Sequence, residues 1–133
     1  MILVSACLVG LNCKYNSGNN FNQEIYDMVK KGEAIFVCPE QLGGLNTPRV
    51  PAEIKYIDGK RHVITKDGRD VTEEYEKGAL ETLCLMKKLG INKAILKSNS
   101  PSCGCGIIYD GTFTGTKIKG NGITSQVLLD NGI

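Results

Sequence analysis

The sequence predicts an α/β fold: a single small domain over residues 1–133 with a mostly parallel, Rossmann-like sheet, flanking helices and a β-hairpin insertion. Three observations support this prediction. Short apolar runs of strand length occur at 2–6, 34–37 and 93–97. Longer segments with helical periodicity lie between these runs and supply the crossovers that parallel strands need. A chain of 133 residues is of the size that forms one hydrophobic core.

The amino-terminal segment predicts a strand followed by a helix. Ile2–Ala6 is apolar and ends in small residues, as a buried strand does. Turn-forming residues follow, and Asn20 is expected to cap a helix over 21–31 that ends at Gly32. The apolar face of this predicted helix consists of Phe21, Ile25, Met28 and Val29.

The next segment predicts a second strand, a loop and a hairpin. Residues 34–37 form the apolar run, and 40–53 is a long loop rich in Gly and Pro. Long structureless loops in small domains are usually functional. The strands predicted at 54–57 and 62–65 flank the turn pair Asp58–Gly59, which favours a β-hairpin.

The second long helix is expected to begin at a cap formed by Asp70 or Thr72 and to run to Leu89, with Gly90 after its end. Its predicted apolar face consists of Ala79, Leu80, Leu83, Met86 and Leu89.

The carboxy-terminal segment predicts a third strand, a second hairpin and a short helix. The strand is expected at 93–97, and the hairpin pairs 107–109 with 112–114 across Asp110–Gly111. The short helix is expected over 124–130.

Composition excludes several functional classes. Sixteen basic and fourteen acidic residues give a net charge of +2, which is too balanced to indicate binding to a nucleic acid polymer. No apolar run is long enough to span a membrane. The first seven residues lack a basic region, and their apolar stretch is too short for a secretion signal, so we expect the cytoplasm. Six cysteines in a cytoplasmic chain favour metal binding or catalysis over disulfides.

Cysteines follow all three predicted buried strands. Cys7 and Cys38 come one residue after the first two strands, and Cys103 lies in the loop after the third. The carboxyl ends of parallel strands meet at one edge of a sheet, so we expect these thiols to converge there. Sulfur-only ligands suit iron–sulfur clusters, zinc or copper(I). Three thiolates on a cluster of four irons leave one iron open to a substrate.

Polar residues beside these cysteines are candidates for catalysis. Glu40 is placed to act as a general base near a metal, although a solvated loop acid is an equal alternative. Ser100 and Ser102 offer hydroxyl groups, for which turn formation is the more common role.

Arg49 and Lys97 suit contact with an anionic substrate, with surface charge as the default alternative. Cys84 is expected to pack in the core, because it lies between leucines in a helix. Cys13 and Cys105 stay open: either is able to replace a ligand, take a transferred sulfur or have no role.

Several short motifs occur in order along the chain: Ser5–Gly10, Cys38–Leu45, Pro48–Arg49, Leu96–Lys97, Ser100–Gly104 and Tyr109–Gly111. Together they resemble the thiouracil desulfidase (TudS) family over essentially the whole length. The resemblance implies a cytoplasmic α/β enzyme with a 4Fe–4S cluster held by Cys7, Cys38 and Cys103.

The resemblance also implies a reaction. The sulfur of a thiolated uracil or thiouridine monophosphate would bind the free iron, and water activated by Glu40 would attack the ring carbon. Ser100 would assist in proton transfer or substrate binding, and Arg49, Lys97 and Ser102 are the further substrate-binding candidates. The products would be the oxo pyrimidine and hydrosulfide, without net electron transfer.

The residues alone leave alternatives open. One is a non-enzymatic metal-binding module, with structural zinc as its simplest form and Cys13 or Cys105 as a fourth ligand. A weaker one is a thiol redox protein that uses Cys103 and Cys105. As partner we expect a small thiolated nucleobase or nucleotide, no nucleic acid polymer and no membrane. A homodimer is compatible with the sequence.

Overall fold

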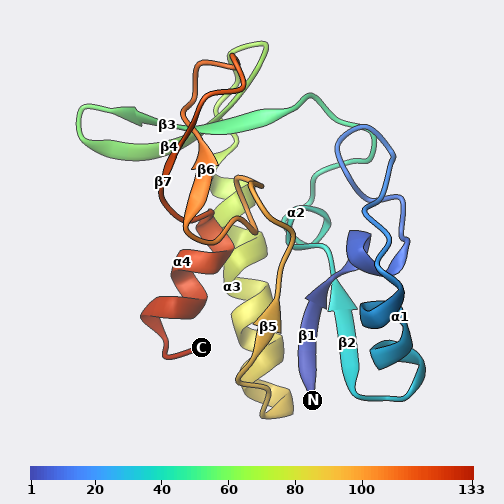
Figure 1. Cartoon of the computed structure of the whole chain (residues 1–133). Helices are drawn as coiled ribbons and strands as arrows, with labels where there is room; N and C mark the ends of the chain where they lie inside the picture. Colours follow the sequence, from blue (N-terminus) through green and yellow to red (C-terminus); the bar gives the residue numbers. More distant parts are fainter.

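A three-stranded parallel sheet forms one half of the molecule, as the computed structural model of residues 1–133 shows (Figure 1). Its strands are β1 (Ile2–Ser5), β2 (Ala34–Val37) and β5 (Ala94–Ile95), in the order β2-β1-β5. β1 pairs in parallel with both neighbours. The predicted α/β fold is therefore confirmed, although β5 is shorter than the run at 93–97 suggested.

Helices cover the two faces of this sheet because alternate side chains of β1 point to opposite sides. Val4 packs in a cluster that includes Ile25 and Met28 of α1 (Gln23–Lys30). Leu3 packs with Leu83 of α3 (Thr72–Leu89). Both helices serve as crossovers between parallel strands, as the sequence predicted.

A short helix, α2 (Pro39–Leu42), occupies part of the segment that was expected to be an irregular loop. Pro39 suits the first helical position, where the missing N–H costs no hydrogen bond. α2 packs almost backbone to backbone on α3. A Cβ atom at Gly43 would lie 1.9 Å from Glu74 O, and one at Gly78 would lie 1.9 Å from Pro39 O. Two glycines therefore set the position of α2.

The first predicted hairpin is confirmed. β3 (Ala52–Ile57) and β4 (Lys60–Thr65) pair antiparallel around Asp58–Gly59, and both turn residues have positive φ. Ile54 and Val63 bury one face of this hairpin in the cluster that contains Tyr75 of α3.

The second predicted hairpin exists with a different return strand. β6 (Ile107–Tyr109) pairs with β7 (Lys117–Lys119), not with 112–114. The chain between the two strands forms a wide loop over 110–116. Gly111 brings this loop so close to β3 that a Cβ atom would lie 2.8 Å from Ile54 O. Docking against β3 therefore replaces the expected tight turn.

Helix boundaries and faces differ in detail from expectation. α1 begins at Gln23 because the side chain of Asn22 accepts the Ile25 N–H, so Phe21 lies outside the helix. On α3, Leu80 and Leu89 are more than half exposed. Thr82 and Tyr75 complete the buried stripe in their place. Cys84 is exposed as well, so its predicted core role is wrong.

The last helix, α4 (Ile123–Asp130), packs beside α3, and Leu128 joins the cluster that contains Leu3. Its start is close to the predicted Thr124. Gly122 precedes it at a tight contact, where a Cβ atom would lie 2.4 Å from Ser102 O. None of the helices is both long enough and apolar enough to cross a membrane.

Candidate active site

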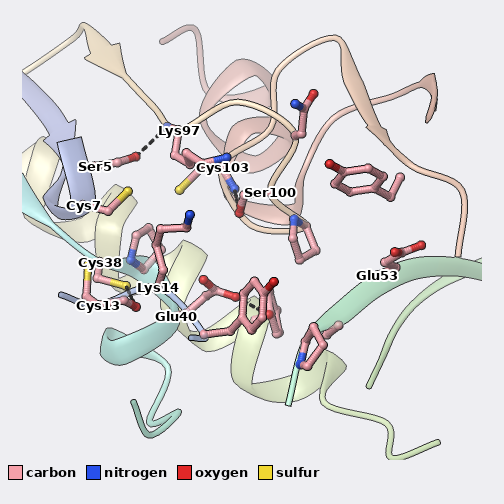
Figure 2. A pocket seen from close by; sticks show the side chains of 18 of the residues that line it. Ser5, Cys7, Cys13, Lys14, Cys38, Glu40, Glu53, Lys97, Ser100 and Cys103 are labelled. Carbon is pink, nitrogen blue, oxygen red and sulfur yellow. Dashed lines mark hydrogen bonds between the residues drawn. The ribbon is translucent and has the colours of Figure 1, made fainter. Parts of the chain in front are cut away.

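The carboxyl edge of the parallel sheet opens on a cavity of about 440 Å³ (Figure 2). Its walls come from the segment after β1, the start of α2, the loop after β5, the start of β3 and the loop 110–116. Cys7, Cys38 and Cys103 all line it, although they are far apart in sequence. This geometry agrees with the expectation that the thiols after the three strands lie together at one edge of the sheet.

Each of these cysteines is positioned by a different local structure. Cys7 lies in the 3₁₀ helix η1 (Ala6–Val9) directly after β1, and it is buried. Cys38 is the residue that precedes α2, and it is half-buried. Cys103 is buried in the loop after β5.

The remaining cysteines differ in position. Cys13 is buried in the same cavity wall, and the Cys38 Sγ lies 3.8 Å from its carbonyl oxygen. Cys105 is exposed and does not line the cavity, whereas Cys103 is buried. A redox pair of Cys103 and Cys105 therefore finds no support in their environments.

The thiols of the cavity differ in proton affinity. A hydrogen bond from Cys13 is the main cause that lowers the pKa of Cys38 to about 7, against the effect of burial. The same neighbour, helped by the charge of Lys97, lowers the pKa of Cys7. Burial raises the pKa of Cys103 to about 12. The pKa values of two of the three thiols are thus shifted toward the thiolate, which is the form that binds metals.

The donor set fits an iron–sulfur cluster. No three His, Cys, Asp or Glu side chains are grouped closely enough to hold a single metal ion. The sulfur atoms instead border a cavity that is shared among several loops, and sulfur-only donors are the usual ligands of iron–sulfur clusters. Cys7, Cys38 and Cys103 are the residues that would hold such a group.

Glu40 lies on α2 and is held by two donors. Its Oε2 is 2.8 Å from Arg49 Nη2, and its Oε1 accepts a hydrogen bond from the Tyr75 hydroxyl. Burial and the adjacent carboxylate raise the pKa of Tyr75, so this residue stays a proton donor. The carboxylate lines the cavity in a fixed orientation (Figure 2).

Arg49 is not part of the cavity wall, contrary to its expected contact with substrate. It donates to the Cys13 carbonyl at 2.9 Å, the Thr47 hydroxyl at 2.9 Å and the Asn46 carbonyl at 3.1 Å, in addition to Glu40. The guanidinium group therefore joins the loop of Cys13 to the carboxylate on α2.

Ser100 lines the cavity beside Cys103 (Figure 2). Its Oγ accepts the backbone N–H groups of Ser102 and Cys103, both at 3.0 Å. A hydroxyl with both acceptor positions used has only its proton to offer to a ligand. The geometry therefore makes Ser100 a hydrogen-bond donor toward the cavity.

Ser102 is almost completely buried and does not line the cavity, contrary to its expected contact with substrate. Its Oγ lies 2.8 Å from the Thr124 hydroxyl of α4. The Ser125 hydroxyl donates to the Cys103 carbonyl at 2.7 Å. These contacts fix the loop that carries Cys103 against the start of α4.

Two lysines flank the thiols. Lys97 lines the cavity, and its backbone N–H donates to Ser5 Oγ at 2.8 Å. Burial and the nearby charge of Lys14 lower the pKa of Lys97. Lys14 also lines the cavity, and the sequence reasoning missed it. Its position directly after Cys13, in a turn-rich segment, was the available signal.

Further lining residues were missed, among them Tyr75, Glu53 and Asn99. Tyr75 reads as an ordinary core aromatic on α3, because its contact with Glu40 depends on how α2 packs. Glu53 ends the long loop over 40–53 and Asn99 lies between two of the motifs, but neither residue was singled out as a candidate. Asn99 has a φ of 63°, a conformation that asparagine tolerates better than most residues.

Comparisons with known proteins match this chain over nearly its whole length. The model of the family described as 2-thiouracil desulfurase matches residues 2–133. The protein "Uncharacterized protein YbbK" of Bacillus subtilis (strain 168) is 46% identical over 138 residues, covering 99% of this chain and 91% of that protein. The solved structure of a 4Fe–4S-dependent thiouracil desulfidase, TudS, has a TM-score of 0.90 and 42% identity, covering 99% of this chain and 86% of that one.

Proposed function

Because the chain belongs to the 2-thiouracil desulfurase family, an enzyme family, we propose that it removes sulfur from a thiolated pyrimidine by hydrolysis. Thiouracil and thiouridine monophosphate are the proposed substrates. Water replaces sulfur on the ring carbon, which becomes a carbonyl, and the sulfur leaves as hydrosulfide with one proton released. No external oxidant or reductant enters this balance.

The proposed cofactor is a 4Fe–4S cluster held by Cys7, Cys38 and Cys103. Support comes from the sulfur-only donor set and from the cluster named for TudS, which is similar to this chain. When bound, such a cluster supplies a thiophilic Lewis acid that polarises the carbon–sulfur bond and accepts sulfide as the leaving group.

Glu40 is the proposed base that takes a proton from the attacking water. Arg49 and Tyr75 hold one oxygen each, so the carboxylate does not have to reorient when the substrate arrives. Its remaining acceptor capacity faces the cavity that it lines.

Ser100 and Lys97 are the proposed contacts to the reacting sulfur and the ring. Ser100 has its proton free because both acceptor positions are used. Lys97, with Lys14 nearby, places positive charge where the sulfur becomes negative. We further propose that residues 1–133 act as one desulfidase-like α/β domain in the cytoplasm.

The observation that carries this proposal is the shared cavity. The three proposed ligand thiols, a fixed carboxylate and a hydroxyl donor line it, and they come from segments separated by up to ninety-six residues. Packing alone does not require these groups to face one space. A ligand-binding centre does.

The test uses protein purified without oxygen. Cys38→Ser is expected to lose both bound iron and the release of sulfide from thiouracil or 4-thiouridine monophosphate. Cys84→Ser is the matched control, because this thiol is exposed on α3, and it should keep both. Glu40→Gln should keep its iron and lose at least about 100-fold in turnover.

Two results would contradict the proposal. An iron content of Cys38→Ser equal to that of the Cys84→Ser control would remove Cys38 from the ligand set. An iron-loaded Glu40→Gln variant with an unchanged rate would show that the carboxylate is not the base.

A further inference from the structure

One thiol of the cavity wall has no role in the proposed reaction. Cys13 is 4% exposed and lines the cavity together with Cys7 and Cys38, but only the latter two are proposed iron ligands. Its side chain is hydrogen-bonded to both of them. Figure 2 shows Cys13 and Cys38 side by side at one side of the cavity. A proposed ligand and a thiol without a role are therefore in contact.

The backbone of Cys13 is fixed beside the start of α2. The Cys13 carbonyl accepts a hydrogen bond from Arg49 Nη2 at 2.9 Å, and the same nitrogen lies 2.8 Å from Glu40, two residues after Cys38. The Cys38 Sγ also lies 3.8 Å from the Cys13 carbonyl oxygen. Arg49 is outside the cavity wall, so this link between the two segments does not depend on what occupies the cavity.

The neighbouring thiols differ in their access to solvent. Cys38 is half-buried, whereas Cys7, Cys13 and Cys103 are buried. Oxidation of cysteine follows the exposure of its sulfur, and a sulfenic acid beside a second thiol condenses with it to a disulfide. In the chain without a cluster, Cys38 is therefore the ligand that a small oxidant reaches first, and Cys13 is the thiol behind it.

We propose that Cys13 is the resolving cysteine for Cys38: when the chain holds no cluster, peroxide oxidises Cys38 and Cys13 captures it in a disulfide. This inference rests on the proposed function only in taking Cys38 as an iron ligand. The disulfide protects that ligand, because reduction restores both thiols. Further oxidation of Cys38 to the sulfinic acid is not reversed in this way.

The two steps balance with hydrogen peroxide as the oxidant. The Cys38 sulfur attacks one peroxide oxygen, the O–O bond breaks, and the other oxygen leaves as hydroxide and is protonated to water. The Cys13 sulfur then attacks the Cys38 sulfur, so that an S–S bond forms, the S–O bond of the sulfenic acid breaks and a second water leaves. Two thiols lose two electrons and two protons, and the peroxide gains them.

The experiment treats the iron-free full chain with hydrogen peroxide, blocks the remaining thiols with iodoacetamide and digests the protein with trypsin without reduction. Cleavage after lysine and arginine places Cys7 and Cys13 on peptide 1–14 and Cys38 on peptide 32–49. We expect mass spectrometry to find these two peptides linked. Fragmentation of the linked pair should show the blocking group on Cys7 and the disulfide on Cys13.

Cys13→Ser tests what the disulfide protects. After peroxide and then a reductant, wild type should take up iron again to nearly its own untreated level. Cys13→Ser should carry a sulfinic acid on Cys38 and recover at least about threefold less of its own untreated iron uptake, because no thiol captures the sulfenic acid. Cys84→Ser is the matched control: it lacks an exposed thiol on α3 and should behave like wild type.

Three outcomes overturn the inference, and two of them need no variant to fold. They are the absence of a link between the two peptides, a link in which Cys7 is bonded and Cys13 is blocked, and equal recovery of iron by Cys13→Ser and wild type.

The peptide map keeps this inference separate from the proposed function, because it requires neither iron nor substrate. A wild type that never binds iron would refute the proposed cofactor, yet a bond between Cys13 and Cys38 would still support the capture step. An active enzyme in which that bond does not form would reject this inference alone.

Discussion

Replacement of Gly78 by alanine tests how the contact between α2 and α3 positions the site. A Cβ atom at this position would lie 1.9 Å from Pro39 O, while real contacts of this kind stay beyond about 3.0 Å, so α2 must move by at least 1.1 Å. The obstacle is a backbone carbonyl that already accepts the Gly43 N–H at 3.0 Å, so no flexible side chain is able to give way.

Two opposing terms set the effect of Gly78→Ala on stability. Alanine favours a helix interior over glycine by about 1 kcal/mol. Overpacking costs about 1–3 kcal/mol, and a backbone clash belongs at the upper end of that range. We expect a net loss of about 2 kcal/mol in the free energy of unfolding, measured by urea denaturation.

The functional effect should be larger than the effect on stability, because α2 carries Glu40 and follows Cys38. A displacement of about 1 Å at a reacting group is enough to lower a rate about 100-fold. Iron content and sulfide release should therefore both fall in the protein that remains folded. Lys77→Ala, at an exposed position of the same helix, should change stability by less than about 0.5 kcal/mol. Gly78→Ala protein with wild-type stability and rate would refute the reasoning.

Two further substitutions test the network around Glu40 and the turn that precedes α3. Arg49→Met should lower the free energy of unfolding, measured by urea denaturation, by about 3 kcal/mol, because Glu40 loses its partner in a nearly buried pair. A loss below about 1 kcal/mol would contradict this expectation. Asp70 accepts the Thr72 hydroxyl and N–H and also contacts His62, and these bonds lower its pKa to about 2. Its folded pKa is below the unfolded value, so its contribution is complete above about pH 4 and lost as the pH falls toward 2. Asp70→Ala should lower the free energy of unfolding by about 1 kcal/mol at pH 7, because hydrogen bonds to an exposed carboxylate are lost. It should also reduce the acid slope of stability between about pH 4 and 2, and an unchanged slope would contradict this.

The sequence predicted the arrangement of the thiols because it depends on a local rule. Strands that read as buried and parallel end at one edge, so residues such as Cys7 and Cys38 are placed by their distance from a strand end. The first hairpin was predicted for a similar reason, since Asp58–Gly59 sets its own turn geometry.

Residues whose positions depend on tertiary packing were not predicted. Arg49 and Ser102 carry functional groups that suit substrate binding, but both residues lie outside the cavity wall. Arg49 binds Glu40 there, and Ser102 shares a hydrogen bond with the Thr124 hydroxyl. Tyr75 gained its contact only because two glycines bring α2 onto α3. The second hairpin does not have the predicted tight turn, because the loop 110–116 packs against β3. Periodicity and turn signals do not report any of these long-range contacts.

The anchoring of Cys103 has a consequence for the carboxy-terminal helix. β5 contributes only two residues to the sheet, so the segment after it has little support from strand pairing. Hydroxyl groups at the start of α4 provide that support instead, through Ser102 and the Cys103 carbonyl. Deletion of α4 would thus release the loop that carries Cys103, one of the three proposed iron ligands, although the helix supplies no atom to the cavity. The last helix of the chain therefore helps to hold Cys103 at the cavity that Cys7 also lines.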